Sequence, residues 1–343
     1  MIKPSAARAL AAVWLAPALL SSTGCSPATG VTRRSTVFDS AVVLTLRDHA
    51  IDSNFEACFA RLRRIDAELN MWDPASGLAR LNARAGSGPV RVDRDIAETA
   101  ARGLELARLS EGIFDPTVGP LVRLWGIGTS SPRMPSEAEE AAARERVGWR
   151  RAKAESAAST VELGKGQALD FGALAKGCGA VEGAKVLEAR GVRSGVLDVG
   201  GCVAAIGSGP GGKPWRIGVQ DPLSPRGTPL GYFSVRESGV DTSGTYERYF
   251  EAGGKRYAHI FDTRTGRPVE GSAISATVVL PLGQNPDGPP LILLVLGPEK
   301  GIAFADSLGM AAVILDSGKR LFLSKAAKPI FTLLDSSYSI AGE

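Results

Sequence analysis

Histidine and cysteine are scarce in this chain, which has two histidines and four cysteines among 343 residues. No two cysteines form a CxxC pair and no histidines cluster beside them, which argues against a zinc site. Basic residues form no run with interleaved aromatic residues, so the sequence does not support nucleic-acid binding. The 40 basic and 36 acidic residues are interspersed, and the composition is that of an ordinary globular protein.

The first 25 residues have the features of an export signal. Lys3 and Arg8 form a basic start, and the apolar stretch over 9–20 is too short for a membrane span of about 20 residues. Small residues then lead to Gly24 and Cys25. This ending resembles that of a bacterial lipoprotein signal, in which Cys25 would carry the lipid. Simple periplasmic secretion after cleavage nearby is the alternative.

These features predict a signal over 1–25, a tether over 26–36 and one domain over 37–335. We expect the protein to be exported and held by a lipid anchor on the periplasmic side of the inner membrane. The three remaining cysteines cannot all pair with one another, so buried thiols are expected at Cys58, Cys178 and Cys202.

The hydrophobic pattern predicts an α+β fold. Five segments are expected to be helical, namely 53–69, 93–110, 135–145, 175–189 and 299–307. A segment rich in β-branched residues predicts a first strand over 37–47, and short strands alternate with glycine turns from Gly191 onward. Because strands and helices do not alternate regularly, the pattern favours α+β rather than a parallel βαβ architecture.

Two segments have features of a binding site. In IFDPTVGPL (113–121), Asp-Pro and Gly-Pro make a rigid turn, where Asp115 either faces a ligand or caps the next turn. In LDFGALAKGCG (169–179), we expect a short strand ending at Asp170 and a helix beginning near Ala175. Backbone N–H groups at that helix start, together with Lys176, would bind phosphate. A buried Asp and a surface Lys are the alternative.

The stretch from Val240 to Glu270 contains candidate catalytic and stacking groups. His259 is the natural general base if the chemistry needs one near neutral pH, although a lone histidine is often structural. Three tyrosines could stack on a planar ring: Tyr246, Tyr249 and Tyr257.

These segments, in this order, resemble the ApbE-type FAD:protein FMN transferases. The resemblance runs from about Val37 to Asp316. It also includes the segments LNMWDPASGLARLN (69–82), VGPLVRLWGIG (118–128), VLDVGGCVAAIGSG (196–209) and PWRIGVQDP (214–222). It implies an α+β fold with a core of the tetrahydrobiopterin-enzyme type (T-fold-like) and flavin bound in a cleft.

The resemblance also implies roles for individual residues. His259 matches the position of the base, and Ala173, through its carbonyl, and Asp287 match magnesium ligands. The matching FAD-binding positions are Phe38, Trp72, Ile113, Phe114, Asp115, Asp170, Lys176 and Ile260. The implied reaction uses FAD and Mg²⁺, places FMN on a threonine of an acceptor protein and releases AMP. Acceptors would be exported or membrane-associated flavoproteins such as redox-pump subunits.

Three departures from the family pattern bear on activity. Phe38-Asp39-Ser40 replaces Met-Gly-Thr, Gly200-Gly201-Cys202 replaces Gly-Gly-Asp, and Leu291 takes the place of a threonine metal ligand. Pro289 and Pro290 are expected to disfavour a helix start and so to displace Asp287. Two alternatives therefore stay open, an FAD-binding lipoprotein without transferase activity and an FAD pyrophosphatase.

Overall fold

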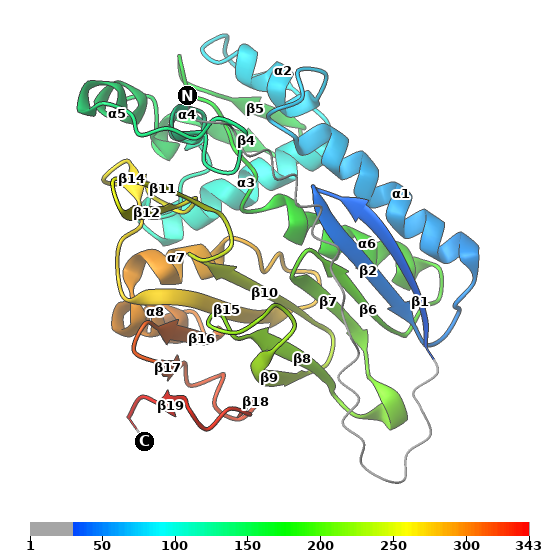
Figure 1. Ribbon diagram of the computed structural model, residues 1–343. Coiled ribbons are helices and arrows are strands. Elements are labelled where there is room, and N and C mark those ends of the chain that lie inside the picture. The colour runs from blue at the N-terminus through cyan, green and yellow to red at the C-terminus, as the bar shows by residue number, and fades with distance from the viewer. Residues whose placement is uncertain (1–29, 343) are drawn as a thin grey trace, which may run out of the picture.

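A computed structural model of the protein describes residues 30–342, so the expected signal and Cys25 lie outside the described residues. Its largest element is a nine-stranded sheet (Figure 1). In spatial order the strands are β1 (Val31–Val37), β2 (Ser40–Leu46), β6 (Ser194–Val199), β7 (Cys202–Gly207), β10 (Ser238–Gly244), β15 (Ala273–Pro281), β16 (Ala311–Asp316), β17 (Arg320–Leu323) and β19 (Ser339–Ile340). Neighbours pair antiparallel, except that β17 and β19 are parallel.

Four helices cover one face of this sheet: α1 (Asp52–Leu69), α6 (Ala175–Ala189), α7 (Pro289–Leu296) and α8 (Pro298–Ser307). α1 and α6 pack over β2, β6 and β7, while α7 and α8 pack over β15 and β16. The opposite face is covered by a three-stranded sheet of β8 (Trp215–Gln220), β9 (Pro229–Val235) and β18 (Phe331–Leu333). Successive apolar residues of β15 and β16 point to opposite faces of the sheet. They contribute both to the core under α7 and α8 and to the core under the three-stranded sheet.

The remaining elements gather at one end of the molecule, at the top of Figure 1. They are the helices α2 (Gly77–Ala83), α3 (Arg94–Leu109), α4 (Gly119–Trp125) and α5 (Glu137–Arg144), and the small sheet of β3 (Val90–Arg91), β5 (Thr160–Glu162) and β4 (Lys153–Glu155). Two hairpins complete the fold, β11 (Tyr249–Ala252) with β12 (Lys255–Ala258) and β13 (Phe261–Asp262) with β14 (Arg267–Pro268). Two short 3₁₀ turns lie over Trp149–Arg151 and Pro210–Gly212.

The α+β prediction is confirmed, and the five expected helices are present, α6 with its predicted bounds. Two local expectations are wrong. Residues 31–36 of the expected tether form most of β1, and the expected strand over 37–47 contains the turn between β1 and β2. Residues before Asp170 form only an isolated bridge, between Ala168 and Val118, rather than a strand. No helix within residues 30–342 is both long and apolar enough to cross a membrane.

α6 lies close to α1 and to β6 because its inner side carries glycine. A Cβ atom placed on Gly183 would lie 2.5 Å from the Leu197 side chain and 3.0 Å from that of Leu62. Both leucines are fully buried, so neither can move aside without disturbing its own packing. Glycine at this position therefore sets the distance between α6 and the sheet.

Gly183→Val should destabilise the fold. We expect overpacking to lower the free energy of unfolding by about 2 kcal/mol, measured as a shift of the urea midpoint. Gly271→Val is the matched control, because a Cβ atom at Gly271 meets nothing within 4 Å. A valine at 183 that left the midpoint at the wild-type or control value would contradict this account of the packing.

Candidate functional site

The loop before α7 docks onto the start of α6. Asn285 donates its side-chain amide to the Leu174 carbonyl at 2.9 Å, and its Oδ1 accepts from the Asp287 backbone N–H at 2.9 Å. Asp287 Oδ2 in turn accepts from the Gly177 N–H at 3.3 Å. A Cβ atom on Gly177 would lie 1.8 Å from Asn285 Oδ1, so only glycine permits this approach.

The expected displacement of Asp287 by the two prolines is wrong. Pro289 and Pro290 are the first residues of α7, where a backbone N–H group would have no acceptor within the helix. The prolines therefore do not prevent the helix from starting, and it begins at Pro289, after Asp287 and the N-cap Gly288. Leu291, one residue further, packs half-buried against the hydrophobic core and contributes to the anchoring of α7.

Asp287 and the Ala173 carbonyl lie beside each other. Gly288 has a φ of 99°, and a Cβ atom placed on it would lie 3.4 Å from Ala173 O. The Ala173 carbonyl accepts no backbone hydrogen bond from loops or turns within the described residues, and Asp287 is 3% exposed. Burial raises the pKa of Asp287. One carboxylate and one carbonyl fit the oxygen preference of Mg²⁺, which retains water in the rest of its shell.

No group of three His, Cys, Asp or Glu side chains suited to a metal occurs in residues 30–342. A cation at this place would therefore depend on backbone and water oxygens in addition to carboxylates. Oxygen ligands of this kind suit Mg²⁺.

Lys176 lies next to this pair. Its Nζ donates to the Gly200 carbonyl at 3.4 Å. Burial lowers the pKa of Lys176, but the negative charges of Asp287 and Asp241 outweigh this effect and raise it overall. Lys176 is therefore cationic at neutral pH, as phosphate binding requires. The helix-start N–H of Gly177, which we expected to face phosphate, is instead directed to Asp287.

His259 is fixed by the β11–β12 hairpin. The pairing of Tyr249 with Ala258 places Arg248 and His259 opposite each other, one residue beyond the strands. The backbone N–H and Nδ1 of His259 both lie 3.0 Å from the Arg248 carbonyl oxygen. Since a carbonyl only accepts, Nδ1 carries the proton and Nε2 is left as the acceptor. This is the tautomer that a general base needs.

Cations surround the His259 ring. Its partial burial and the charges of Arg248 and Lys176 lower the pKa of His259 to about 4. The ring is consequently neutral at pH 7. An anionic substrate beside it would offset those cations and raise the pKa toward the working pH.

Asp170 and Arg248 complete the polar surroundings of His259. Asp170 Oδ1 accepts from the Gly172 N–H at 2.6 Å, and burial raises the pKa of Asp170 against the opposing effect of Arg123 and Arg248. Arg248 influences Asp170, Lys176 and His259 at once. The sequence interpretation missed Arg248, although its place beside the tyrosines of the 240–270 segment could have suggested it.

Asp115 has a structural role in its turn. It is 5% exposed, and its Oδ1 accepts from the backbone N–H and the hydroxyl of Thr117 at 2.8 and 2.7 Å. Its Oδ2 accepts from the Trp149 N–H at 2.9 Å. Of the two possibilities for Asp115, the structure supports the cap. A flavin contact by this carboxylate would have to share oxygens that are already bonded.

The remaining predicted flavin contacts differ in exposure. The side chains of Ile113, Phe114 and Ile260 are buried in hydrophobic clusters, so only their backbone atoms are available to a ligand. Trp72 is 52% exposed, as a stacking residue would be before its ligand binds. Phe38 is half-buried with a φ of 56°, and its ring meets Gly179 of α6. Their contacts with a flavin stay predictions.

The three tyrosines do not form one stacking surface. Tyr257 stacks on Phe250 with ring centroids 5.2 Å apart, whereas Tyr249 is exposed beneath the Arg256 guanidinium. Tyr246 packs against Gly244. Stacking of any one of these tyrosines on a planar ligand stays a prediction. The expected free thiols are confirmed, with Cys58 and Cys202 buried and Cys178 half-buried.

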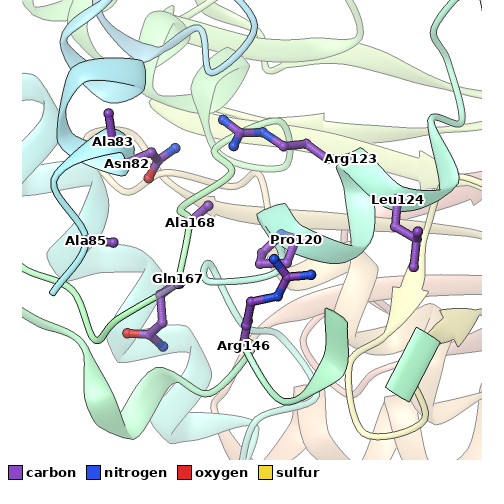
Figure 2. A pocket seen from close by; sticks show the side chains of 10 residues that line it. Asn82, Ala83, Ala85, Pro120, Arg123, Leu124, Arg146, Gln167 and Ala168 are labelled. Atoms are coloured by element: carbon purple, nitrogen blue, oxygen red, sulfur yellow. The ribbon is translucent and has the colours of Figure 1, made fainter. Parts of the chain in front are cut away.

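A cavity of about 490 Å³ lies between α2, α4 and the loop over 164–168 (Figure 2). In the view of Figure 2, the Arg123 side chain lies above Pro120 and the Arg146 side chain lies just below it. None of the predicted site residues lines it. The side chains that line this cavity include no base or nucleophile, so we place the chemistry at the start of α6. Arg123 connects the two places electrostatically, because its charge lowers the pKa of Asp170.

This chain is similar to known proteins in both sequence and fold. The FAD:protein FMN transferase of Treponema pallidum is 33% identical over 303 residues, which cover 84% of each chain. That of Klebsiella pneumoniae is 31% identical over 261 residues, or 75% of each chain. The crystal structure of the ApbE protein of Thermotoga maritima superposes with a TM-score of 0.81 at 26% identity, covering 88% of this chain and 99% of that one.

The flavin transferase ApbE of Vibrio cholerae superposes almost as well, with a TM-score of 0.79 at 26% identity over 89% of this chain and all of that one. The ApbE family model matches residues 35–314, which include every predicted flavin, metal and catalytic position. This range also contains the β11–β12 hairpin and both sides of the α6 docking contact. The chain therefore belongs to the ApbE family of flavin transferases.

Proposed function

We propose that the protein transfers FMN from FAD to a threonine hydroxyl of an acceptor protein and releases AMP, in a reaction that depends on Mg²⁺. The relatives from Treponema pallidum and Klebsiella pneumoniae are named FAD:protein FMN transferases. The observation that carries the proposal is the tautomer of His259, whose Nε2 is free to accept a proton beside the cation of Lys176. A binding protein without turnover would not need this arrangement.

The residues divide the chemistry among them. His259 Nε2 takes the proton of the threonine hydroxyl, and the oxygen attacks the phosphorus of the FMN phosphoryl group. The P–O bond to AMP breaks, AMP leaves with the electron pair, and the flavin stays attached through a phosphoester. Lys176 holds the pyrophosphate by its charge, and Arg248 orients His259 through its carbonyl.

Ala173 and Asp287 would hold the divalent cation. When bound there, Mg²⁺ supplies charge neutralisation at the pyrophosphate. The Asn285 side chain positions Asp287, because it bonds both the Asp287 N–H and the Leu174 carbonyl. Leu291 removes one hydroxyl ligand from this arrangement, which water can replace in an octahedral shell.

The test of this function uses the protein without its first 25 residues, mixed with FAD, Mg²⁺ and a threonine-containing acceptor flavoprotein domain. We expect covalent flavin on the acceptor together with released AMP, and loss of both on addition of EDTA. FAD binding without AMP release, with an acceptor validated by a known transferase, would contradict the proposal and favour the binding lipoprotein. Free FMN formed without acceptor would favour the pyrophosphatase.

His259→Ala should abolish transfer and keep FAD binding. Loss of a general base costs ~10²–10⁴-fold in rate, whereas the flavin pocket is unchanged. The kcat/KM of wild-type transfer, which reports the free enzyme, should keep its value as the pH falls below 6, because His259 without substrate is protonated only near its pKa of about 4. Lys176→Ala is the contrasting variant and should weaken FAD binding. Normal transfer by His259→Ala would remove His259 from the mechanism.

We also propose that the protein is exported and lipid-anchored through Cys25, on the periplasmic side of the inner membrane. The basic start, the short apolar stretch and Gly24-Cys25 support this placement. Acceptors on the same side, such as redox-pump subunits of the membrane, would then be within reach. Cys25→Ser should release the full-length protein from the membrane fraction into the soluble fraction, and unchanged fractionation would argue against lipidation.

A further inference from the structure

Asp241 is a buried carboxylate with an unsatisfied oxygen. It lies in β10 in the middle of the large sheet and is 1% exposed. Among the described residues, its Oδ1 has no hydrogen-bond partner. A buried carboxylate without a partner costs several kcal/mol, so a group that is strongly attracted to it is expected at this place.

The neighbours of Asp241 are those of the proposed cation site. The loop that carries Asp287 packs on β10 close to Asp241, since a Cβ atom placed on Gly239 would lie 3.0 Å from the Pro286 side chain. Burial, and after it the charge of Asp287, raises the pKa of Asp241 to about 8. Lys176 influences both carboxylates, yet no ion pair joins it to either one in residues 30–342. Asp241 therefore lies near the Asp287 loop with no cation paired to it among the described residues.

Cys202 links Asp241 to the Gly200-Gly201 turn. β7 and β10 pair with Val203 opposite Val240, and continuing this register by one residue brings Cys202 opposite Asp241. The Cys202 thiol on the neighbouring strand therefore lies beside the Asp241 carboxylate and lowers its pKa. Oδ1 of this carboxylate stays without a hydrogen-bond partner among the described residues.

We propose that Asp241 is a second carboxylate ligand of the divalent-cation site, opposite Asp287 and the Ala173 carbonyl. This inference rests on the proposed function, because it needs a cation beside Asp287. Two carboxylates neutralise a divalent cation, and a carbonyl with water completes an oxygen shell. Asp241 supplies a ligand to a site in which Leu291 contributes none. It also places a negative charge beside Cys202, where the family pattern has Asp.

The test measures Mn²⁺ binding directly, by electron paramagnetic resonance, with wild-type protein without its first 25 residues. Asp241→Asn keeps the shape of the side chain and removes its charge. We expect Mn²⁺ affinity to fall by at least about tenfold, as for loss of a supporting metal ligand. FAD affinity measured in EDTA should be unchanged, because Asp241 is not among the predicted flavin-binding positions.

Asp198→Asn is the matched control. Asp198 is also influenced by Lys176, but its Oδ1 accepts from the Gly201 N–H at 2.8 Å, a bond that asparagine can keep. Its Mn²⁺ affinity should equal that of the wild type. The double variant Asp241→Asn with Cys202→Asp returns a carboxylate across the same strand pair and should recover part of the lost affinity.

Thermal melting separates a ligand from a structural residue. In EDTA, Asp241→Asn should not lower Tm, because the Oδ1 atom of Asp241 has no hydrogen-bond partner to lose, and the variant should lose the Mg²⁺-induced rise in Tm. Wild-type Mn²⁺ affinity in Asp241→Asn, or a lower Tm in EDTA, would overturn the assignment. If the wild type itself binds no Mn²⁺, the metal dependence of the proposed function fails, and the inference fails with it.

Discussion

The contact between the 285–288 loop and the start of α6 determines the geometry of the whole site. Gly177 lets Asn285 and Asp287 reach the backbone of α6, and the residue before it in the same helix is Lys176. α6 is in turn held against α1 and β6 by Gly183. A change of even one methyl group along this series of contacts would move the carboxylate relative to the lysine. The positions of charges in the site thus depend on the positions of glycines.

Electrostatic balance explains why these charges are tolerated in a buried place. Lys176 is kept cationic by two carboxylates, while Asp287 receives N–H donors from the helix start that would otherwise be unsatisfied. His259 lies among cations and is neutral as a result. An anionic pyrophosphate entering between Lys176 and Arg248 would therefore meet positive charge without first displacing a bound carboxylate from either side chain. The positive charges of Lys176 and Arg248 thus suit an anionic ligand.

Much of the fold could be predicted from the sequence, for reasons that are local. α6 was predicted with its bounds because its small and apolar residues continue without a proline, despite three glycines, and α5 begins with the Ser136 capping box. β1 was missed because it is an edge strand whose Arg33 and Arg34 are exposed, so its sequence has the composition of a linker. Edge strands bury too little to show a clear alternation.

The site was predictable only where its residues belong to motifs. Lys176, Asp287 and His259 lie in recognisable segments, and the structure brings Lys176 close to each of the other two. The effect of Pro289 and Pro290 was misjudged, because their position relative to the helix start decides whether a missing N–H matters. Arg248 acts through its carbonyl as well as through its charge, and side-chain chemistry does not reveal the role of the carbonyl.

Asp241 shows most clearly what a linear comparison omits. Along the chain, Cys202 and Leu291 count as two separate losses of polar groups from one family pattern. In the fold, β7 and β10 are neighbours, so a carboxylate lost from one strand can be replaced from the other at nearly the same point in space. The Cys202 side chain then lies beside the replacement. Since the relevant quantity for a cation is the oxygen set around it rather than the sequence position of each donor, a departure at one position has to be judged together with the residue that faces it.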